Sequence, residues 1–77
     1  MKWKFKKGDR VFIEWVDIVA DVHTEDDIVP CEAETVGWVD AQSPTWIRVL
    51  TSRYLDGCNL ADKIVIPKGC IKNVKKI

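Results

Sequence analysis

The sequence predicts an all-β fold: a small barrel of five strands, formed by one domain that spans residues 1–77. Three observations predict it. Short apolar stretches alternate with polar residues at a period of two, which is typical of half-buried strands. Residues that favour turns separate these stretches. A long acidic loop follows the first strand, and a proline just before the last strand leaves room only for a 3₁₀ turn.

Each predicted strand is bounded by residues that interrupt a hydrogen-bonded ladder. The strands are expected at residues 10–17, 34–41, 45–52, 62–66 and 71–76. Gly37 marks a bulge or a sharp bend inside the second strand. A turn at 42–44 and a loop at 53–61 separate the next strands. Pro67 ends the fourth strand because it has no N–H to donate, and residues 68–70 suit one 3₁₀ turn.

The apolar residues that point inward from these strands are expected to form the core. They are Val11, Ile13, Val39, Ile47, Val49, Ile64, Ile66, Ile71 and Val74. A chain of this length buries only about 60% of its unfolded surface, so large rings contribute much of the available burial. The stretch 2–6 also alternates, and it either extends the first strand or lies as an arm across the barrel.

Charged residues are segregated along the chain, although the net charge is zero. Residues 1–10 have a net charge of +4, and residues 48–77 have a net charge of +5. Residues 11–47 contain no Lys or Arg and have a net charge of −9. The acidic segment 18–33 forms the long first loop, in which residues 25–29 are expected to form one helical turn. If the two ends of the chain meet in the fold, the molecule has one positive and one negative side.

The sequence offers no cofactor, metal or catalytic motif. Cys31, Cys58 and Cys70 are an odd set without a C-x-x-C pair, which favours reduced thiols in or near the core. A metal site that adds His23 is the alternative, but the spacings match no compact zinc pattern. The chain lacks G-x-S-x-G, P-loop and H-E-x-x-H motifs, so we expect a protein that is not an enzyme, with His23 as a solvated loop residue.

No apolar run approaches the roughly 20 residues of a membrane helix. The basic N-terminal residues have no apolar run behind them, so a signal peptide is not expected. We therefore expect a cytoplasmic protein that makes no contact with a membrane.

Two stretches resemble SH3-like barrels. VIPKGCIKNV (residues 65–74) resembles the strand, proline, 3₁₀ turn and final strand that close SH3 domains. KKGDRVFIEW (residues 6–15) resembles the first strand of SH3-like, Tudor-like and KOW-like barrels. The pattern covers nearly the whole chain and implies an SH3-like barrel. It lacks the Tyr-rich groove of peptide-binding SH3 domains, since Tyr54 is the single tyrosine and lies in another segment, so binding of Pro-rich peptides is not expected.

Three pieces also resemble a group of small uncharacterised proteins from phages and bacterial genomes. That group reads roughly G-D-x-V-x-V-x-W-x-D, then P-x-x-C-x-x-V-G-W, then I-P-K-x-x-I-K-x-I. The corresponding pieces here lie within residues 8–17, 30–38 and 66–72. The resemblance implies the same fold and a mobile-element origin, and it supplies no site residues.

The favoured function is a non-catalytic, phage-related binding module that engages a protein partner. An acidic loop can steer a basic partner, and Trp and Tyr are frequent interface anchors. The candidate contact residues are Trp15, Glu25, Asp26, Asp27, Trp38, Trp46 and Tyr54. The competing explanation for these rings is that they cap the ends of the barrel.

Nucleic-acid binding by the two terminal strands is the alternative. The candidate residues are Lys2, Trp3, Lys4, Lys6, Lys7, Arg10, Lys72, Lys75 and Lys76. Trp3 and Phe5 could stack on bases, whereas the zero net charge and the acidic loop argue against such a ligand. Self-association is a third hypothesis, in which the basic side of one copy meets the acidic side of another. A two-fold dimer would require self-complementary patches.

Overall fold

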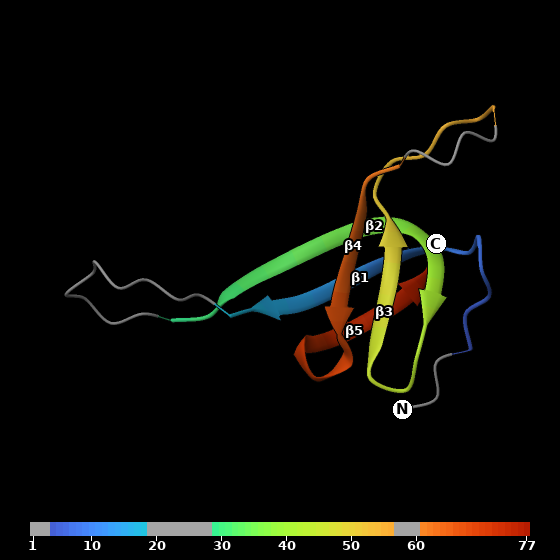
Figure 1. The fold of residues 1–77 in the computed structure, drawn as a ribbon. Helices are drawn as coiled ribbons and strands as arrows, with labels where there is room; N and C mark the ends of the chain where they lie inside the picture. Colours follow the sequence, from blue (N-terminus) through green and yellow to red (C-terminus); the bar gives the residue numbers. More distant parts are fainter. Residues whose placement is uncertain (1–3, 19–28, 57–60) are drawn as a thin grey trace.

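The computed structural model describes residues 4–18, 29–56 and 61–77, and in them it contains one antiparallel sheet of five strands (Figure 1). The strands are β1 (Arg10–Asp17), β2 (Cys31–Gln42), β3 (Trp46–Leu50), β4 (Lys63–Pro67) and β5 (Ile71–Lys76). A 3₁₀ helix, η1 (Lys68–Cys70), precedes β5. The predicted all-β fold and the 3₁₀ turn before the last strand are confirmed.

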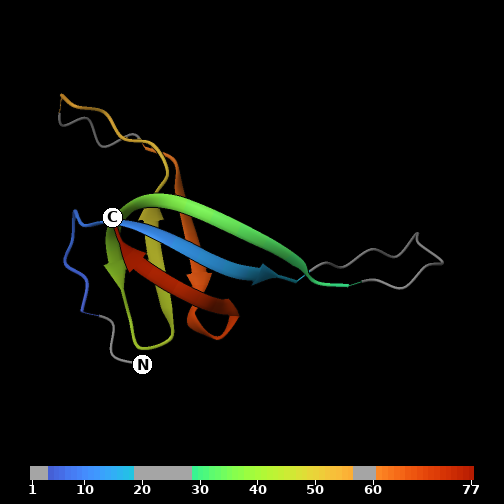
Figure 2. The ribbon, with the colours of Figure 1, turned by 180° about the vertical axis from the view of Figure 1, so that it is seen from behind.

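The strand order is β4-β3-β2-β1-β5, so β1 is hydrogen-bonded on both sides. Figure 2 shows β1 between β2 and β5. At the end of the β1–β5 ladder, the backbone N–H of Ile77 donates to the carbonyl of Arg10 at 2.9 Å. The first and the last strand of the chain therefore lie side by side.

Residues 4–6 form an arm rather than an extension of β1. A turn at residues 6–9 has Gly8 at a φ of 92°, which glycine adopts without steric cost. Lys6 N–H donates to a carboxylate oxygen of Asp9 at 2.9 Å and fixes this turn. Before the turn, Phe5 packs against the core, and its carbonyl accepts a hydrogen bond from Gln42 Nε2 at 2.9 Å.

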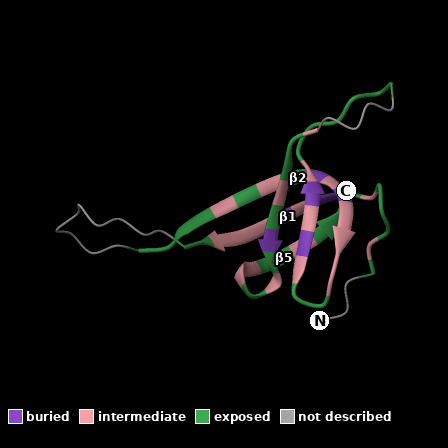
Figure 3. Cartoon of the chain, in the orientation of Figure 1, coloured by how far each residue is buried: buried purple, intermediate pink, exposed green. Residues whose placement is uncertain are grey.

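The core lies on the inner side of the coiled sheet (Figure 3). Six of the predicted residues are fully buried, with exposures of 0–2%. They are Val11, Ile13, Val39, Ile47, Val49 and Ile66. The other three predicted core residues, Ile64, Ile71 and Val74, are half-buried and pack against this cluster. These three residues lie on β4 and β5, which have a neighbour on one side only.

The sheet does not close into the predicted barrel. Strands β4 and β5 are the two edges of the sheet, and no ladder joins them. Pro67, the last residue of β4, has no N–H to offer a further strand. The helix η1 then contacts both β1 and β3, so it lies between the two halves of the coiled sheet where a closing ladder would have to form.

Strand β2 is longer than predicted and bends sharply. It starts at Cys31 rather than residue 34, because its first three residues pair with the end of β1. The ladder with β3 is interrupted by a bulge between Val39 and Ala41. The predicted helical turn over residues 25–29 lies outside the described residues.

In the described part of the chain, we find no helix whose length and hydrophobicity would allow it to cross a bilayer.

Gly37→Ala is expected to destabilise the fold by about 1–3 kcal/mol, the usual range for an overpacked site. A Cβ at residue 37 would overlap the backbone carbonyl oxygen of Leu50, and backbone cannot move aside as a flexible side chain can. The matched control is Gly69→Ala in η1, where a Cβ would meet nothing within 4 Å. Urea unfolding of both variants measures the difference. Equal midpoints for the two variants would contradict the close approach of β2 and β3.

Candidate functional site

The β2-β1-β5 part of the sheet presents one continuous surface to solvent, which we call the outer face. Strand alternation turns Val11 and Ile13 towards the core, so their neighbours along β1 point outwards. The register then fixes which residues of β2 and β5 lie beside them. The outer face consists of Arg10, Phe12, Glu14, Glu32, Glu34, Val36, Trp38, Lys72, Asn73 and Lys75.

Carboxylates gather at one end of the outer face, which we call the acidic half (Glu14, Glu32 and Glu34). Glu14 of β1 and Glu34 of β2 are directly opposite each other in the ladder. Asn73 Nδ2 makes a long contact of 3.4 Å with Glu14 Oε1. Among the described residues, nothing bonds to the carboxylate of Glu34. Like charges at opposed positions destabilise a sheet, so folding alone does not favour this pair.

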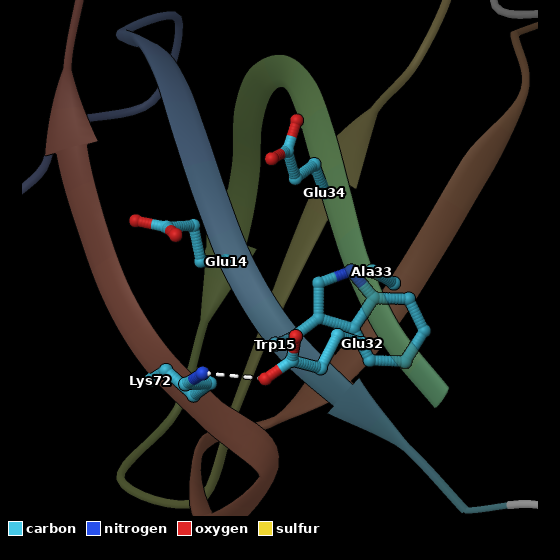
Figure 4. A pocket seen from close by; sticks show the side chains of 6 residues that line it. All are labelled: Glu14, Trp15, Glu32, Ala33, Glu34 and Lys72. Carbon is cyan, nitrogen blue, oxygen red and sulfur yellow. Dashed lines mark hydrogen bonds and ion pairs between the residues drawn. The ribbon is translucent and has the colours of Figure 1, made fainter. Parts of the chain in front are cut away.

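A groove with a volume of about 460 Å³ lies over the acidic half (Figure 4). Its lining consists of Glu14, Trp15, Glu32, Ala33, Glu34 and Lys72. Lys72 Nζ contacts Glu32 Oε1 at 2.8 Å across β1. This hydrogen bond and the attraction between the charges hold the pKa of Glu32 below its ordinary value and raise the pKa of Lys72. Glu32 therefore forms an ion pair with Lys72, which also attracts Glu14 from a greater distance, whereas neither Glu14 nor Glu34 forms an ion pair with a described residue.

Cations and aromatic rings gather towards the other end, which we call the basic half (Arg10, Phe12, Trp38 and Lys75, together with Arg53, which reaches the Trp38 ring from the loop after β3). Arg10 of β1 is paired with Trp38 of β2. The guanidinium carbon of Arg53 lies 4.2 Å from the centroid of the Trp38 ring. Lys75 Nζ lies 5.5 Å from the centroid of the Phe12 ring. Cation–π contacts of this kind hold the cations at the surface without neutralising them.

The three cations of the basic half have no carboxylate partner among the described residues. Other cations do: Lys76 Nζ lies 3.4 Å from Asp9 Oδ1, and Lys72 is paired with Glu32. The sequence argument missed Phe12 and Arg53. Alternation placed Phe12 on the outward face of its strand, but only the register puts it beside Lys75. No pattern in the sequence indicated the contact between Arg53 and Trp38.

The aromatic residues predicted to contact a protein lie in four separate places. Trp15 packs against the core, and its Nε1–H donates to Thr35 Oγ1 at 3.0 Å. Trp38 is on the outer face of β2, and Trp46 lies on β3 with the guanidinium of Arg48 5.7 Å from its ring. Tyr54 is 59% exposed in the loop after β3. The loop residues Glu25, Asp26 and Asp27 lie outside the described residues.

The residues predicted to contact nucleic acid are also only partly brought together. Lys4, Lys6 and Lys7 are exposed on the N-terminal arm, whereas Arg10 and Lys75 belong to the basic half. Phe5, which could stack on bases, is half-buried and packs against the core. Lys2 and Trp3 lie outside the described residues.

The structure describes only some of the residues on which the metal and thiol predictions depend. Within the described ranges, no group of three or more His, Cys, Asp or Glu is arranged to hold a metal ion. Cys31 is exposed at the start of β2, which corrects its expected place in or near the core, and Cys70 is half-buried in η1. Cys58 and His23 lie outside the described residues.

A second charged cluster supports the bend of β2. The carboxylate of Asp40, at the bulge, accepts a hydrogen bond from Arg48 Nε at 2.6 Å and lies 3.6 Å from Lys63 Nζ. The side chain of Asp40 is only 12% exposed. The bond from Arg48, followed by the attraction of Lys63, holds the pKa of Asp40 below its ordinary value of 3.8. This cluster joins β2, β3 and β4, and the charge of Asp40 is paired with cations of the same chain.

Comparison of the chain with models of protein families, with curated proteins and with solved structures found no match. The resemblance to SH3-like barrels therefore stays a prediction from sequence pattern, and the functional argument rests on the geometry of the outer face.

Asp40→Asn is expected to lower the free energy of unfolding by about 1 kcal/mol near pH 7, because the charge that strengthens the bond from Arg48 is lost. The folded pKa of Asp40 is depressed, so its contribution is present above the unfolded value and is lost as pH falls through the folded pKa. Urea titrations of wild type and variant should therefore converge below about pH 3.8. Glu32→Gln, which breaks a solvent-exposed pair, is the control and should cost less. A gap that persists at low pH would contradict the assignment.

Proposed function

We propose that the chain is a non-catalytic binding module that engages a basic segment of a protein partner through the acidic half of the outer face. The observation that carries the proposal is the direct opposition of Glu14 and Glu34, neither of which forms an ion pair with a described residue; the nearby Lys72 is bonded to Glu32. A Lys or Arg side chain between these carboxylates would relieve their repulsion and gain charge-assisted hydrogen bonds.

The surroundings of this pair suit such a ligand. The groove over the acidic half is open to solvent and wide enough for a side chain to enter. The segment that carries Glu25, Asp26 and Asp27 connects the same ends of β1 and β2, so the chain beyond the groove is also acidic. Carboxylates grouped in this way accelerate the encounter with a basic partner more than they raise its affinity.

The lining of the groove supports a binding role over a catalytic one. It offers carboxylates and one amine, with no His, Cys or Ser. A carboxylic acid that donates a proton near neutral pH needs a raised pKa, whereas the pKa of Glu32 in this groove is lowered by Lys72. A phage-related origin and a cytoplasmic location belong to the same proposal and rest on the sequence alone.

Glu34→Lys is expected to raise the stability of the fold by about 0.5 kcal/mol while weakening the binding of basic ligands. The substitution converts a like-charge pair into an opposite-charge pair, so stability and binding move in opposite directions. The measurements are thermal unfolding and fluorescence anisotropy with a labelled lysine-rich peptide, with its acetylated form as the neutral ligand.

The matched comparison is Glu14→Lys/Glu34→Lys against Asp56→Lys/Asp62→Lys, which changes net charge equally in the loop after β3. The first double variant should lose peptide binding about tenfold or more, and the second should retain most of it. Equal losses would show that net charge alone attracts the peptide, and the proposal would fail.

Nucleic-acid binding is the second candidate, and a specific observation favours it. Phe12 and Trp38 are diagonal neighbours on adjacent strands, and Arg53 and Lys75 lie against their rings. Aromatic rings on an open sheet beside cations are the surface on which single strands stack. The acidic half on the same face would repel phosphate, which is why we place this candidate second.

If nucleic acid is the ligand, a labelled single-stranded oligonucleotide should bind at low salt and dissociate steeply as salt rises. Arg53→Glu/Lys75→Glu should abolish that binding, whereas Lys4→Glu/Lys6→Glu, which changes the same charge on the N-terminal arm, should weaken it less. Absence of binding at about 20 mM salt, where screening is weak, would remove this candidate.

A further inference from the structure

We propose that two copies of the chain pair face to face through the outer face, with the basic half of each copy against the acidic half of the other. The proposal uses the surface of the proposed function, but it commits to a second copy of this chain as the occupant. The outer face carries cations and carboxylates that form no ion pair with a described residue. Because both signs of charge lie on one face, that face can be complementary to a second copy of itself.

The register determines how the halves would meet. Three successive outward pairs of the β1–β2 ladder matter here. Phe12 and Val36 form the middle pair. Arg10 and Trp38 form the pair on one side of it, and Glu14 and Glu34 form the pair on the other side. A two-fold axis that lies in the interface, across the strands at the level of Phe12 and Val36, exchanges the two flanking pairs. The four-residue step from Arg10 to Glu14 spans about 13 Å, so opposite charges meet at both ends of the interface.

Apolar side chains of β1 and β2 occupy the middle of the outer face, and Lys75 of β5 lies at the same level, where it would face its own counterpart in the second copy. Phe12 of β1 is directly opposite Val36 of β2, and Val36 is 42% exposed although it lies in the middle of the sheet. An apolar centre with charges at the rim is the usual anatomy of a protein interface. A second copy would cover this centre and neutralise the charges in the same step.

A second copy fits the face better than an unrelated occupant because Arg10 and Arg53 at one end and Glu14 and Glu34 at the other require opposite partners at a fixed spacing. Lys72 and Glu32 already form an ion pair with each other, and this pair lies in the acidic half of the outer face. Pairing through the edge of the sheet is disfavoured, since the edge strand β5 bears Lys72, Lys75 and Lys76. Two outer faces therefore offer each other opposite charges, whereas two β5 edges would bring lysines together.

The size of the face sets the expected strength. Strand β1 has 8 residues, which corresponds to a length of about 26 Å, and three strands side by side span about 14 Å. The resulting area of about 400 Å² per copy is half that of a standard interface. We therefore expect a weak dimer that forms at high protein concentration and low salt, where charge pairs are least screened.

A charge-swap experiment tests the pairing. Sedimentation equilibrium is measured from about 10 µM to about 1 mM protein in roughly 20 mM salt, where the screening length exceeds the spacing of the charges. Variant one carries Glu14→Lys/Glu34→Lys, and variant two carries Arg10→Glu/Arg53→Glu. Each alone has outer faces that repel each other and should dimerise at least about tenfold more weakly than wild type.

An equimolar mixture of the two variants should dimerise again, because a mainly basic face then meets a mainly acidic one. Recovery in the mixture excludes misfolding as the reason for the loss in each variant. Three results would overturn the proposal: a monomeric wild type throughout this range, a mixture that stays monomeric, or dimers that both variants leave unchanged.

The same variants separate this proposal from the proposed function. Variant two retains Glu14 and Glu34, so it should still bind the lysine-rich peptide while it fails to dimerise alone. Peptide binding that is absent from a wild type that dimerises would reject the proposed function and leave the pairing intact. A monomeric wild type that binds the peptide would reject the pairing alone.

Discussion

The double pairing of β1 is the constraint on which the rest of the structure depends. Strand β1 is hydrogen-bonded to β2 on one side and to β5 on the other, so three stretches far apart in the sequence form one surface. The core residues Val11 and Ile13 lie on the inner side of the same strand at 0% exposure, so the strand cannot rotate or slip without exposing them. The register that buries the core is thus the register that opposes Glu14 to Glu34 and places Lys75 beside Phe12.

The distribution of ion pairs separates charges that support the fold from charges that remain for a ligand. Asp40 is nearly covered and has two cations within 4.0 Å, and it holds the bend of β2 against its neighbours. Asp9 has a depressed pKa because the backbone of Lys6 donates to it, with Lys76 as a further cause. The outer face differs from these clusters. Its Glu34 and its Arg10 have no partner among the described residues, although each lies where a partner of opposite charge would add stability.

Local pattern was sufficient to predict much of the fold. The bounds of β1 and β5 agree with the expected strands, because period-two alternation and flanking turn residues marked them clearly. The start of β2 was wrong because Cys31, Glu32 and Ala33 show no strong alternation, and they become a strand by pairing with the end of β1. Closure of the barrel was wrong because it depends on where η1 lies relative to β1 and β3, which is a tertiary property.

The outer face could not be predicted because it is a consequence of register. The sequence argument divided the charges into basic ends and an acidic middle, and it expected opposite sides of the molecule to carry opposite charges. The ladders instead bring Arg10 and Lys75 onto the same side as Glu14 and Glu34. A shift of one residue would have turned each of these side chains to the other face. The net charges of residues 1–10, 11–47 and 48–77 do not indicate which face of the sheet each charged side chain occupies.

The two proposed uses of the outer face cannot operate at the same time. A basic partner and a second copy both need Glu14 and Glu34, so each excludes the other by mass action. The second copy gains from its match at both ends of the face, but it buries a small area and must reach high concentration. A basic segment needs only the acidic half, so it competes well at low protein concentration. Opposed carboxylates that weaken the isolated sheet would then be relieved in either bound state, which gives one physical reason for both ligands to favour the same surface.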